Sequence, residues 1–257
     1  MTIATNLYLD YWKELVKSAD SVTSKSDLVT FFVFTDNPES VKDFANDIIN
    51  VDVCAIEVPS YKWPEATLLR YQVFLENFEK IEADILIHLD ADMAINKSPW
   101  HRICENLAQN EICLVRHPGF WRSNSFKKLF IYLQNPNLLV GDIKQEISKG
   151  GLGAWEDNAE SDAFVPRSRR RKYFCGGVWF GRREPIRALL RELSTATEND
   201  LGKGIIAVWH DESHLNRWVS QNIYGEESPE LCFDETYPQL HGLSPYITAV
   251  RKTLKTR

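Results

Sequence analysis

The chain has 257 residues, with 30 lysines and arginines against 36 aspartates and glutamates, so its formal net charge is −6. This length suffices for a sizeable hydrophobic core, and a hydrophobic content of 44% with 26% charged residues is typical of globular proteins. These values exclude a disordered, collagen-like or coiled-coil chain, and the acidic balance argues against nucleic-acid binding. We expect a single domain over residues 1–257.

The cysteines and the N-terminal residues indicate the environment of the protein. The five cysteines form no CxxC pair, so we expect free, buried thiols rather than a disulfide framework or a zinc site. No apolar stretch reaches the roughly 18 residues of a membrane span. The first residues lack the basic and apolar regions of a signal peptide, so we expect a cytoplasmic protein.

In the first half of the chain, apolar strand patterns alternate with helix patterns. Residues 29–34, 51–58 and 85–89 predict strands, and residues 39–48 and 65–81 predict helices. Apolar strands separated by helices are typical of a parallel sheet covered on both faces. The sequence therefore predicts an α/β fold with a mostly parallel central sheet flanked by helices.

The second half contains further strand and helix patterns around a polar stretch. Residues 112–115 and 173–181 predict strands, and residues 185–197 and 211–220 predict helices. The stretch 137–171 is rich in Gly, Asn, Asp, Ser and Pro, so we expect a long mobile loop there.

Two aspartates, Asp90 and Asp92, directly follow the predicted strand 85–89. Ligands of open α/β sheets bind at the carboxyl ends of strands, and two carboxylates there can converge on a magnesium or manganese ion that also binds phosphate. The alternative is a solvated turn with two acidic residues.

The segment 209–216, WHDESHLN, concentrates ionisable residues at the start of a predicted helix. His210 and His214 are spaced like zinc ligands, but the HExxH pattern of zinc proteases is absent. Asp211 or Ser213 could simply cap the helix. Glu212 could instead stabilise positive charge at a sugar carbon or act as a nucleophile.

Two other segments have a functional and a structural interpretation. In CGGVWFG, residues 175–181, the paired glycines could let a ligand approach the backbone, or they could form a bulge. This pattern is not the GxGxxG of a dinucleotide site. HPGFW, residues 117–121, is a turn with a histidine and two aromatic residues that could bind sugar or pack internally.

Taken together, these segments resemble glycosyltransferase family 6, which includes the blood-group A and B transferases and α-1,3-galactosyltransferase. The strongest motif is WHDESHLN, which is identical to the signature of that family. The other matching motifs occur in the same order as in the family. They are IATNLY (3–8) with YWK (11–13), the Trp63, Thr67 and Arg70 pattern, LDADM (89–93), HPGFW and CGGVWFG.

The resemblance implies a nucleotide-diphospho-sugar transferase fold, that of the type A glycosyltransferases. It implies transfer of GalNAc or Gal from a UDP-sugar to the 3-hydroxyl of a galactoside, possibly fucosylated, with retention of configuration. Glu212 would be the catalytic carboxylate, acting covalently or by stabilising an oxocarbenium ion. Asp90 and Asp92 would bind Mn²⁺, with Mg²⁺ possible. Because this chain keeps both aspartates, we expect metal dependence.

The resemblance also implies the residues that bind each substrate. Tyr8 would stack on uracil, and Lys252 with an arginine of the basic tail, residues 244–257, would close over the diphosphate when UDP orders this otherwise mobile tail. The acceptor would contact His117, Trp209 and Asp234. The donor-binding set would be Ile3, Ala4, Tyr8, Trp63, Thr67, Arg70, Asp90, Ala91, Asp92, Cys175, Gly176, Gly177, His210, Asp211 and Lys252.

Some features differ from the family pattern or leave alternatives open. Vertebrate members carry a membrane anchor and stem, so the chain resembles the minimal microbial or viral form. Small side chains at Cys175 and Gly177 leave room for an acetamido group, so we expect a preference for UDP-GalNAc unless Trp179 or the long insertion at about residues 134–171 fills the space. On the same reasoning, Gly177→Ala should shift the preference toward galactose. Rival interpretations are a non-catalytic UDP-sugar or glycan-binding protein and a metal-dependent hydrolase.

Overall fold

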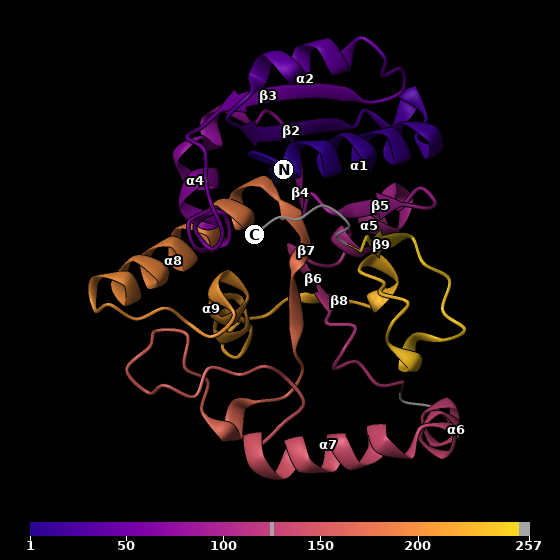
Figure 1. Cartoon of the computed structure of the whole chain (residues 1–257), viewed down its shortest axis with the longest axis vertical. Helices are drawn as coiled ribbons and strands as arrows, with labels where there is room; N and C mark the ends of the chain where they lie inside the picture. The colour runs from indigo at the N-terminus through magenta and orange to yellow at the C-terminus, as the bar shows by residue number, and fades with distance from the viewer. Residues whose placement is uncertain (124–125, 252–257) are drawn as a thin grey trace.

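A computed structural model describes residues 1–123 and 126–251 of the chain, and Figure 1 shows a mixed α/β fold. The first sheet has the order β1-β2-β3 and is entirely parallel, as predicted. Its strands and the helices that cover it are β1 (Thr2–Ile3), α1 (Tyr8–Val22), β2 (Thr30–Thr35), α2 (Pro38–Ala45) and β3 (Asp52–Glu57).

Alternate residues of β2 face two separate cores. Phe31 and Val33 pack into the core that also contains Trp12 of α1, whereas Phe32 and Phe34 pack into a second core. Because side chains alternate across a strand, an all-apolar strand needs cover on both faces. The apolar run at residues 29–34 correctly predicted this arrangement.

The second sheet has the order β4-β7-β6-β8 and is mixed. It continues the first sheet, because the Leu89 amide donates to the Met1 carbonyl at 3.3 Å and the Met1 amino group donates to Ile87 at 2.7 Å. Its strands are β4 (Ile85–Leu89), β6 (Ile112–Arg116), β7 (Phe174–Arg182) and β8 (Gly225–Glu227).

Strand β7 runs antiparallel to both of its neighbours, β4 and β6, so the parallel arrangement is not continuous across the molecule. The physical reason is the connection. After β6 the chain forms the α6–α7 hairpin at the opposite end of the molecule from the first sheet, and β7 returns from there (Figure 1). A return without a crossover produces an antiparallel pair.

The helices around the second sheet partly match the prediction. The expected helix 65–81 is broken at Leu69 and at Asn77, both of which have non-helical backbone angles. As a result Arg70 begins a helix of its own. The helices are α3 (Glu65–Leu68), α4 (Arg70–Glu76), α5 (Trp100–Leu107), α8 (Arg183–Gly202) and α9 (His210–Val219).

The stretch 137–171 is not the unstructured loop that its composition predicted. Helices α6 (Phe126–Gln134) and α7 (Pro136–Lys149) form a hairpin, and the residues between α7 and β7 fold around the buried side chain of Arg170. Its guanidinium donates to the carbonyls of Val165, Lys149 and Glu156 at 2.8, 2.5 and 3.3 Å. This cation orders the segment together with a small apolar cluster that contains Trp155 and Val165.

The expectations for the tail and for the cysteines also need correction. Strand β9 (Ile247–Ala249) pairs with β5 (Met93–Ile95), so the first part of the tail is structured, whereas Lys252 lies outside the described residues. All five cysteines are free, but Cys104 is exposed and Cys54 only partly buried. Among residues 1–123 and 126–251, no helix combines the length and apolarity needed to cross a membrane.

Candidate functional site

A buried arginine joins three of the predicted motifs. Arg70, at the start of α4, donates to Asp211 Oδ2 at 2.6 Å and to Asp90 Oδ1 at 2.7 Å. It also donates to the Gly176 carbonyl at 3.1 Å. Its side chain is 7% exposed, so these contacts form largely out of water. The structure therefore brings together the LDADM, CGGVWFG and WHDESHLN segments around one cation.

Glu212 lies beside this cation and is held in place from β7. Its Oε2 accepts a hydrogen bond from the Gly176 amide at 2.8 Å, and the Tyr173 hydroxyl bonds to the same carboxylate. The Tyr173 hydroxyl also lies 3.2 Å from the Ala154 carbonyl. Gly176 belongs to β7 and Tyr173 directly precedes this strand, so the two partners fix the carboxylate at the N-terminal end of α9.

Burial shifts the ionisation of the site residues. It raises the pKa of Glu212 to about 7, although the Gly176 amide and Tyr173 oppose the shift. It also raises the pKa of Asp211 to about 7 against the effect of Arg70. Burial alone would lower the pKa of Arg70, but Asp211 and Asp90 raise it by more, so Arg70 stays charged. Perturbed groups that cluster in this way are typical of functional sites.

A surface pocket next to Arg70 is lined by many of the predicted donor-binding residues. Tyr8, Trp63, Asp90 and Asp92 reach it from three different segments, and Tyr61 lines it as well. The complete lining consists of Ile3, Thr5, Tyr8, Tyr61, Trp63, Ala66, Thr67, Arg70, Asp90, Ala91 and Asp92. The carboxyl ends of β1 and β4 meet here, as expected for a ligand site of an α/β sheet.

Asp90 and Asp92 fit a hard cation that shares its ligands with phosphate. Both carboxylates line the pocket, and magnesium and manganese accept carboxylate oxygens together with phosphate and water. Within the described part of the chain, no group of three or more His, Cys, Asp or Glu could hold a metal ion. A cation here would therefore need ligands from a bound diphosphate as well.

His210 connects the pocket to the start of α9. Its Nδ1 lies 3.1 Å from the Thr67 hydroxyl, and its ring packs edge-on against Trp63 at 5.5 Å. The backbone of His210 has φ +47°, a left-handed conformation that is strained in residues other than glycine. Such strain is typical of functional sites, where it aims a side chain.

The adjacent glycines Gly176 and Gly177 of β7 leave space that the protein's own carboxylates occupy. A Cβ on Gly177 would lie 2.6 Å from Asp90 Oδ2, and one on Gly176 would lie 3.1 Å from Glu212 Cβ. The register of β6 against β7 also shifts next to these residues, which agrees with the bulge interpretation. Trp179 points into the second core and is fully buried, so it does not fill the sugar space.

Two of the predicted acceptor residues lie near each other. His117 is close enough to Asp234 for that carboxylate to influence its pKa, but burial dominates and lowers the pKa to about 4. The His117 ring also packs against Tyr173, the partner of Glu212, at 5.8 Å. Trp209 is 55% exposed at the N-terminal end of α9. The HPGFW turn therefore both packs internally and approaches the candidate site.

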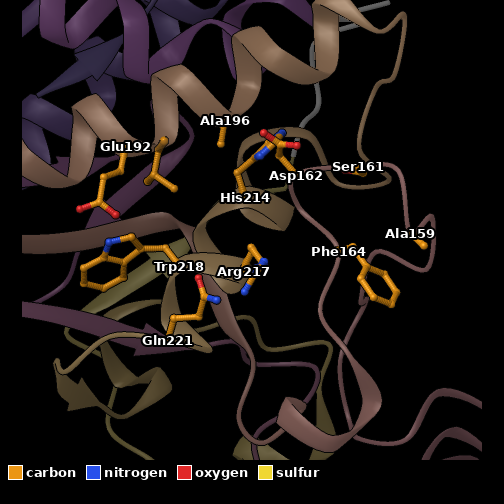
Figure 2. Close-up of a pocket in the computed structure, with 11 residues that line it drawn as sticks. Ala159, Ser161, Asp162, Phe164, Glu192, Ala196, His214, Arg217, Trp218 and Gln221 are labelled. Carbon is orange, nitrogen blue, oxygen red and sulfur yellow. The ribbon is translucent and has the colours of Figure 1, made fainter.

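The two histidines of α9 lie in different surroundings, which excludes a shared zinc site. His214 lies 3.6 Å from Asp200 and lines a second hollow of about 370 Å³, which His210 does not line. Figure 2 shows this hollow between α8, α9 and the segment around Phe164, with Arg217 and Trp218 in its wall.

Residues 151–256 match the model of glycosyltransferase family 6. The chain is 26% identical over 240 residues to the rat histo-blood group ABO system transferase 1, covering 90% of the chain and 59% of that protein. It is 25% identical over 241 residues to the human globoside alpha-1,3-N-acetylgalactosaminyltransferase 1, covering 92% and 60%. A third relative, the Escherichia coli O-antigen biosynthesis glycosyltransferase WbnI, is 26% identical over 194 residues, covering 75% and 68%.

The resemblance to glycosyltransferase family 6 is confirmed. The type A glycosyltransferase fold expected from it agrees with the mixed α/β architecture. The chain spans about 60% of the length of the rat and human relatives that it matches. The family-6 match contains Gly176, Asp211 and Glu212, whereas Arg70 and Asp90 come from the preceding half of the chain.

Several residues of the candidate site were not identified from the sequence. Tyr61 and Thr5 line the pocket next to Arg70, and Tyr71 donates its hydroxyl to the Asp211 carbonyl at 3.0 Å. No pattern distinguishes them from core residues. His88 did give a signal, because it interrupts the apolar strand ILIHL. Its Nε2 lies 3.4 Å from Asp90, and burial lowers its pKa to about 4.

Proposed function

We propose that the protein is a retaining glycosyltransferase that moves GalNAc or Gal from a UDP-sugar to the 3-hydroxyl of a galactoside. The observation that carries this proposal is the convergence of Asp90, Asp211 and Glu212 around Arg70 beside the pocket at the strand ends. The family-6 match and the transferases among the relatives support it.

The donor would occupy the pocket next to Arg70. In this proposal Tyr8 stacks on uracil, and Asp90 and Asp92 hold Mn²⁺ or Mg²⁺ at the diphosphate. The metal would stabilise the charge that develops on the UDP leaving group. Arg70 orients Asp90 and Asp211 through its two short ion pairs. Lys252 would contribute from the C-terminal tail.

Glu212 would supply negative charge at the anomeric carbon of the transferred sugar. The Gly176 amide and Tyr173 fix its carboxylate, so the group is preorganised for this role. Asp211 and His210 would contact the sugar itself, next to Gly176. The acceptor would enter beside His117, Trp209 and Asp234, and it would be a plain or fucosylated galactoside.

We further propose UDP-GalNAc as the preferred donor. The name of the human relative specifies N-acetylgalactosamine transfer. In this chain Cys175 has a small side chain and Gly176 has none, and Trp179 faces the core. An acetamido group would therefore meet little steric hindrance from β7.

The decisive experiment is a transfer assay with UDP-GalNAc and UDP-Gal over a panel of plain and fucosylated galactosides, with and without manganese. We expect manganese-dependent transfer, faster with UDP-GalNAc, to at least one acceptor. UDP release without any transfer product would instead indicate a hydrolase. Binding of UDP-sugar with no release of UDP would indicate a non-catalytic binding protein.

A further inference from the structure

The α6–α7 hairpin exposes a large number of apolar side chains. Phe126 is 93% exposed and Ile147 is 75% exposed, and no helix residue other than Asp142 of α7 is buried in either described helix. So many large apolar side chains exposed on two neighbouring helices are unusual for a globular protein and often mark an interaction site. The exposed set, which we call the hairpin face, is Phe126, Leu129, Phe130, Leu133, Leu139, Val140, Ile143 and Ile147.

The hairpin face follows helical periodicity in both helices. In α6 the apolar residues occupy positions 126, 129, 130 and 133, which is the i, i+3, i+4, i+7 spacing of one helix face. In α7 positions 139, 140, 143 and 147 also fall on one face. Each helix is therefore amphipathic, and in both the apolar side is directed to solvent.

The inward side of the hairpin is held by polar contacts instead. Asp142 accepts two hydrogen bonds of 2.6 Å from Arg122 and another of 2.6 Å from the Tyr132 hydroxyl. Gln145 donates to the Gly153 carbonyl at 2.9 Å. Because polar contacts anchor the hairpin, its apolar side remains available for contact with a binding partner.

The charge beside the hairpin face identifies the kind of surface that it fits. The segment 122–149 carries five basic and two acidic residues, whereas the whole chain has a net charge of −6. Of the acidic residues, Asp142 is neutralised by Arg122. Lys127 and Lys144 border the hairpin face on α6 and α7, are exposed, and make no ion pair within the described residues.

We propose that the hairpin face docks on an anionic phospholipid bilayer and lies in the plane of its surface. Apolar side chains on one side of a helix with lysines along its border are typical of interfacial membrane helices. An anionic leaflet attracts such lysines. A symmetric dimer would bring the bordering lysines of both copies to one interface whose segment carries only two acidic residues, so the charge pattern favours the membrane over a second copy.

The shape of the molecule is compatible with this docking. Figure 1 shows α6 and α7 at the end of the molecule opposite to the first sheet, with no described element beyond them. The hairpin can therefore meet a flat surface without obstruction. Neither helix crosses the bilayer in this arrangement. The inference does not depend on the proposed transferase activity.

The test is co-sedimentation of the full chain with vesicles of phosphatidylcholine, alone or mixed with phosphatidylglycerol. We expect binding to the anionic vesicles. The triple variant Phe130→Gln, Leu133→Gln, Ile147→Gln should weaken it at least about tenfold, because the apolar contact is lost. The variant Lys127→Gln, Lys144→Gln should weaken it about fivefold per lysine and reduce its salt dependence.

The matched control is Ile223→Gln, which changes an equally exposed apolar residue outside the hairpin and should bind like the wild type. All substituted side chains are exposed, so unchanged thermal melts should confirm folding. Absence of binding to anionic vesicles, or binding that the hairpin variants do not change, overturns the proposal. A dimer in sedimentation equilibrium that the triple variant dissociates, without vesicle binding, would assign the hairpin face to a second copy instead.

Discussion

Glu212 is partly buried and carries a proposed catalytic charge, so it links activity to stability. Replacing it by glutamine keeps the shape and removes the charge. We expect Glu212→Gln to lower kcat about a hundredfold or more, with little change in UDP affinity. Initial rates and UDP titrations measure the two effects. An activity within a few fold of the wild type would show that another residue is the catalytic carboxylate.

The same variant should also change how the melting temperature depends on pH. Burial raises the pKa of Glu212 to about 7, above its ordinary value of 4.5, so the folded state binds this proton more tightly than the unfolded state. The wild type therefore loses stability as pH rises through the window between these values. Glutamine removes this loss, so the melting temperature of Glu212→Gln relative to the wild type should be higher at pH 8 than at pH 4.5.

Tyr173 sets the pH range in which Glu212 is charged. The groups that influence this carboxylate are the Gly176 amide and Tyr173, which favour its ionisation, together with Asp90 and Arg70. Removing the hydroxyl in Tyr173→Phe should raise the pKa of Glu212 further. We expect the acidic limb of the kcat/KM profile to move to higher pH, with the rate largely recovered in alkaline buffer. An unchanged profile, like that expected for the control Tyr224→Phe, would contradict this.

At the residue scale, the sequence predicted individual site residues better than their partners. Asp90, Asp92 and Glu212 were visible because ionisable residues at strand and helix ends stand out. The role of Arg70 as the common partner of Asp90 and Asp211 was not predictable from spacing, since 141 positions separate Arg70 from Asp211. Such pairing depends on the three-dimensional arrangement of the helices and strands.

At the scale of single elements, strand β7 leaves no room for a larger side chain at Gly177. A Cβ on Gly177 would lie 2.6 Å from Asp90 Oδ2 and 3.1 Å from Met93 Cε, and Arg70 restrains Asp90. We therefore expect Gly177→Ala to lower activity with UDP-GalNAc and UDP-Gal alike, by about tenfold or more, because even small displacements at a reacting site are costly.

The matched control for this variant is Gly202→Ala, since nothing lies within 4 Å of a Cβ at that helix end. It should retain wild-type activity with both donors. Gly177→Ala could instead keep its activity and only change its preferred donor to UDP-Gal. That result would show that the glycine acts through the size of the sugar pocket.

Arg170 determines the stability of the segment between α7 and β7. Its buried guanidinium satisfies three backbone carbonyls and pairs with Asp157 at 2.8 Å. Arg170→Met would leave these acceptors without a donor, at a cost of about 2–5 kcal/mol. We expect a clear drop in the melting temperature in differential scanning calorimetry. The exposed neighbour Arg171 provides the control, because Arg171→Met should melt like the wild type.

The elements that were predicted wrongly share a physical cause. The polar composition of 137–171 suggested a loop, but the apolar positions of α7 have helical spacing, and Arg170 orders the residues between α7 and β7. The predicted helix 65–81 had continuous periodicity, yet the backbone turns at Leu69 and Asn77. In both cases tertiary contacts, which local patterns do not contain, decide the outcome. The apolar strands were predicted correctly because burial on both faces leaves a clear pattern.

At the scale of the whole molecule, donor binding should stabilise the fold. The proposed donor pocket is built from segments before and after β4, so a ligand there binds only the folded chain. A ligand at a hundred times its dissociation constant adds about 2.7 kcal/mol. We expect UDP with manganese to raise the melting temperature, and EDTA to abolish most of this shift.

Substitution of the aspartate pair tests the metal in the same experiment. Asp92→Asn should lose most of the shift caused by UDP with manganese, whereas Asp52→Asn, an exposed aspartate at the start of β3, should keep it. If UDP raised the melting temperature of Asp92→Asn, or of the wild type in excess EDTA, by the full amount, donor binding would not need the metal.

The position of Arg70 also limits how the chain can be recombined with its relatives. A hybrid that takes residues 151–256 from one parent and the remainder from another would join a foreign Asp211 to a resident Arg70 and Asp90. If one parent lacks the Arg70, Asp90 or Asp211 that it contributes, the hybrid contains a buried charge without its ion-pair partner. Successful crossovers should therefore require parents that agree at these three positions, however far they have diverged elsewhere.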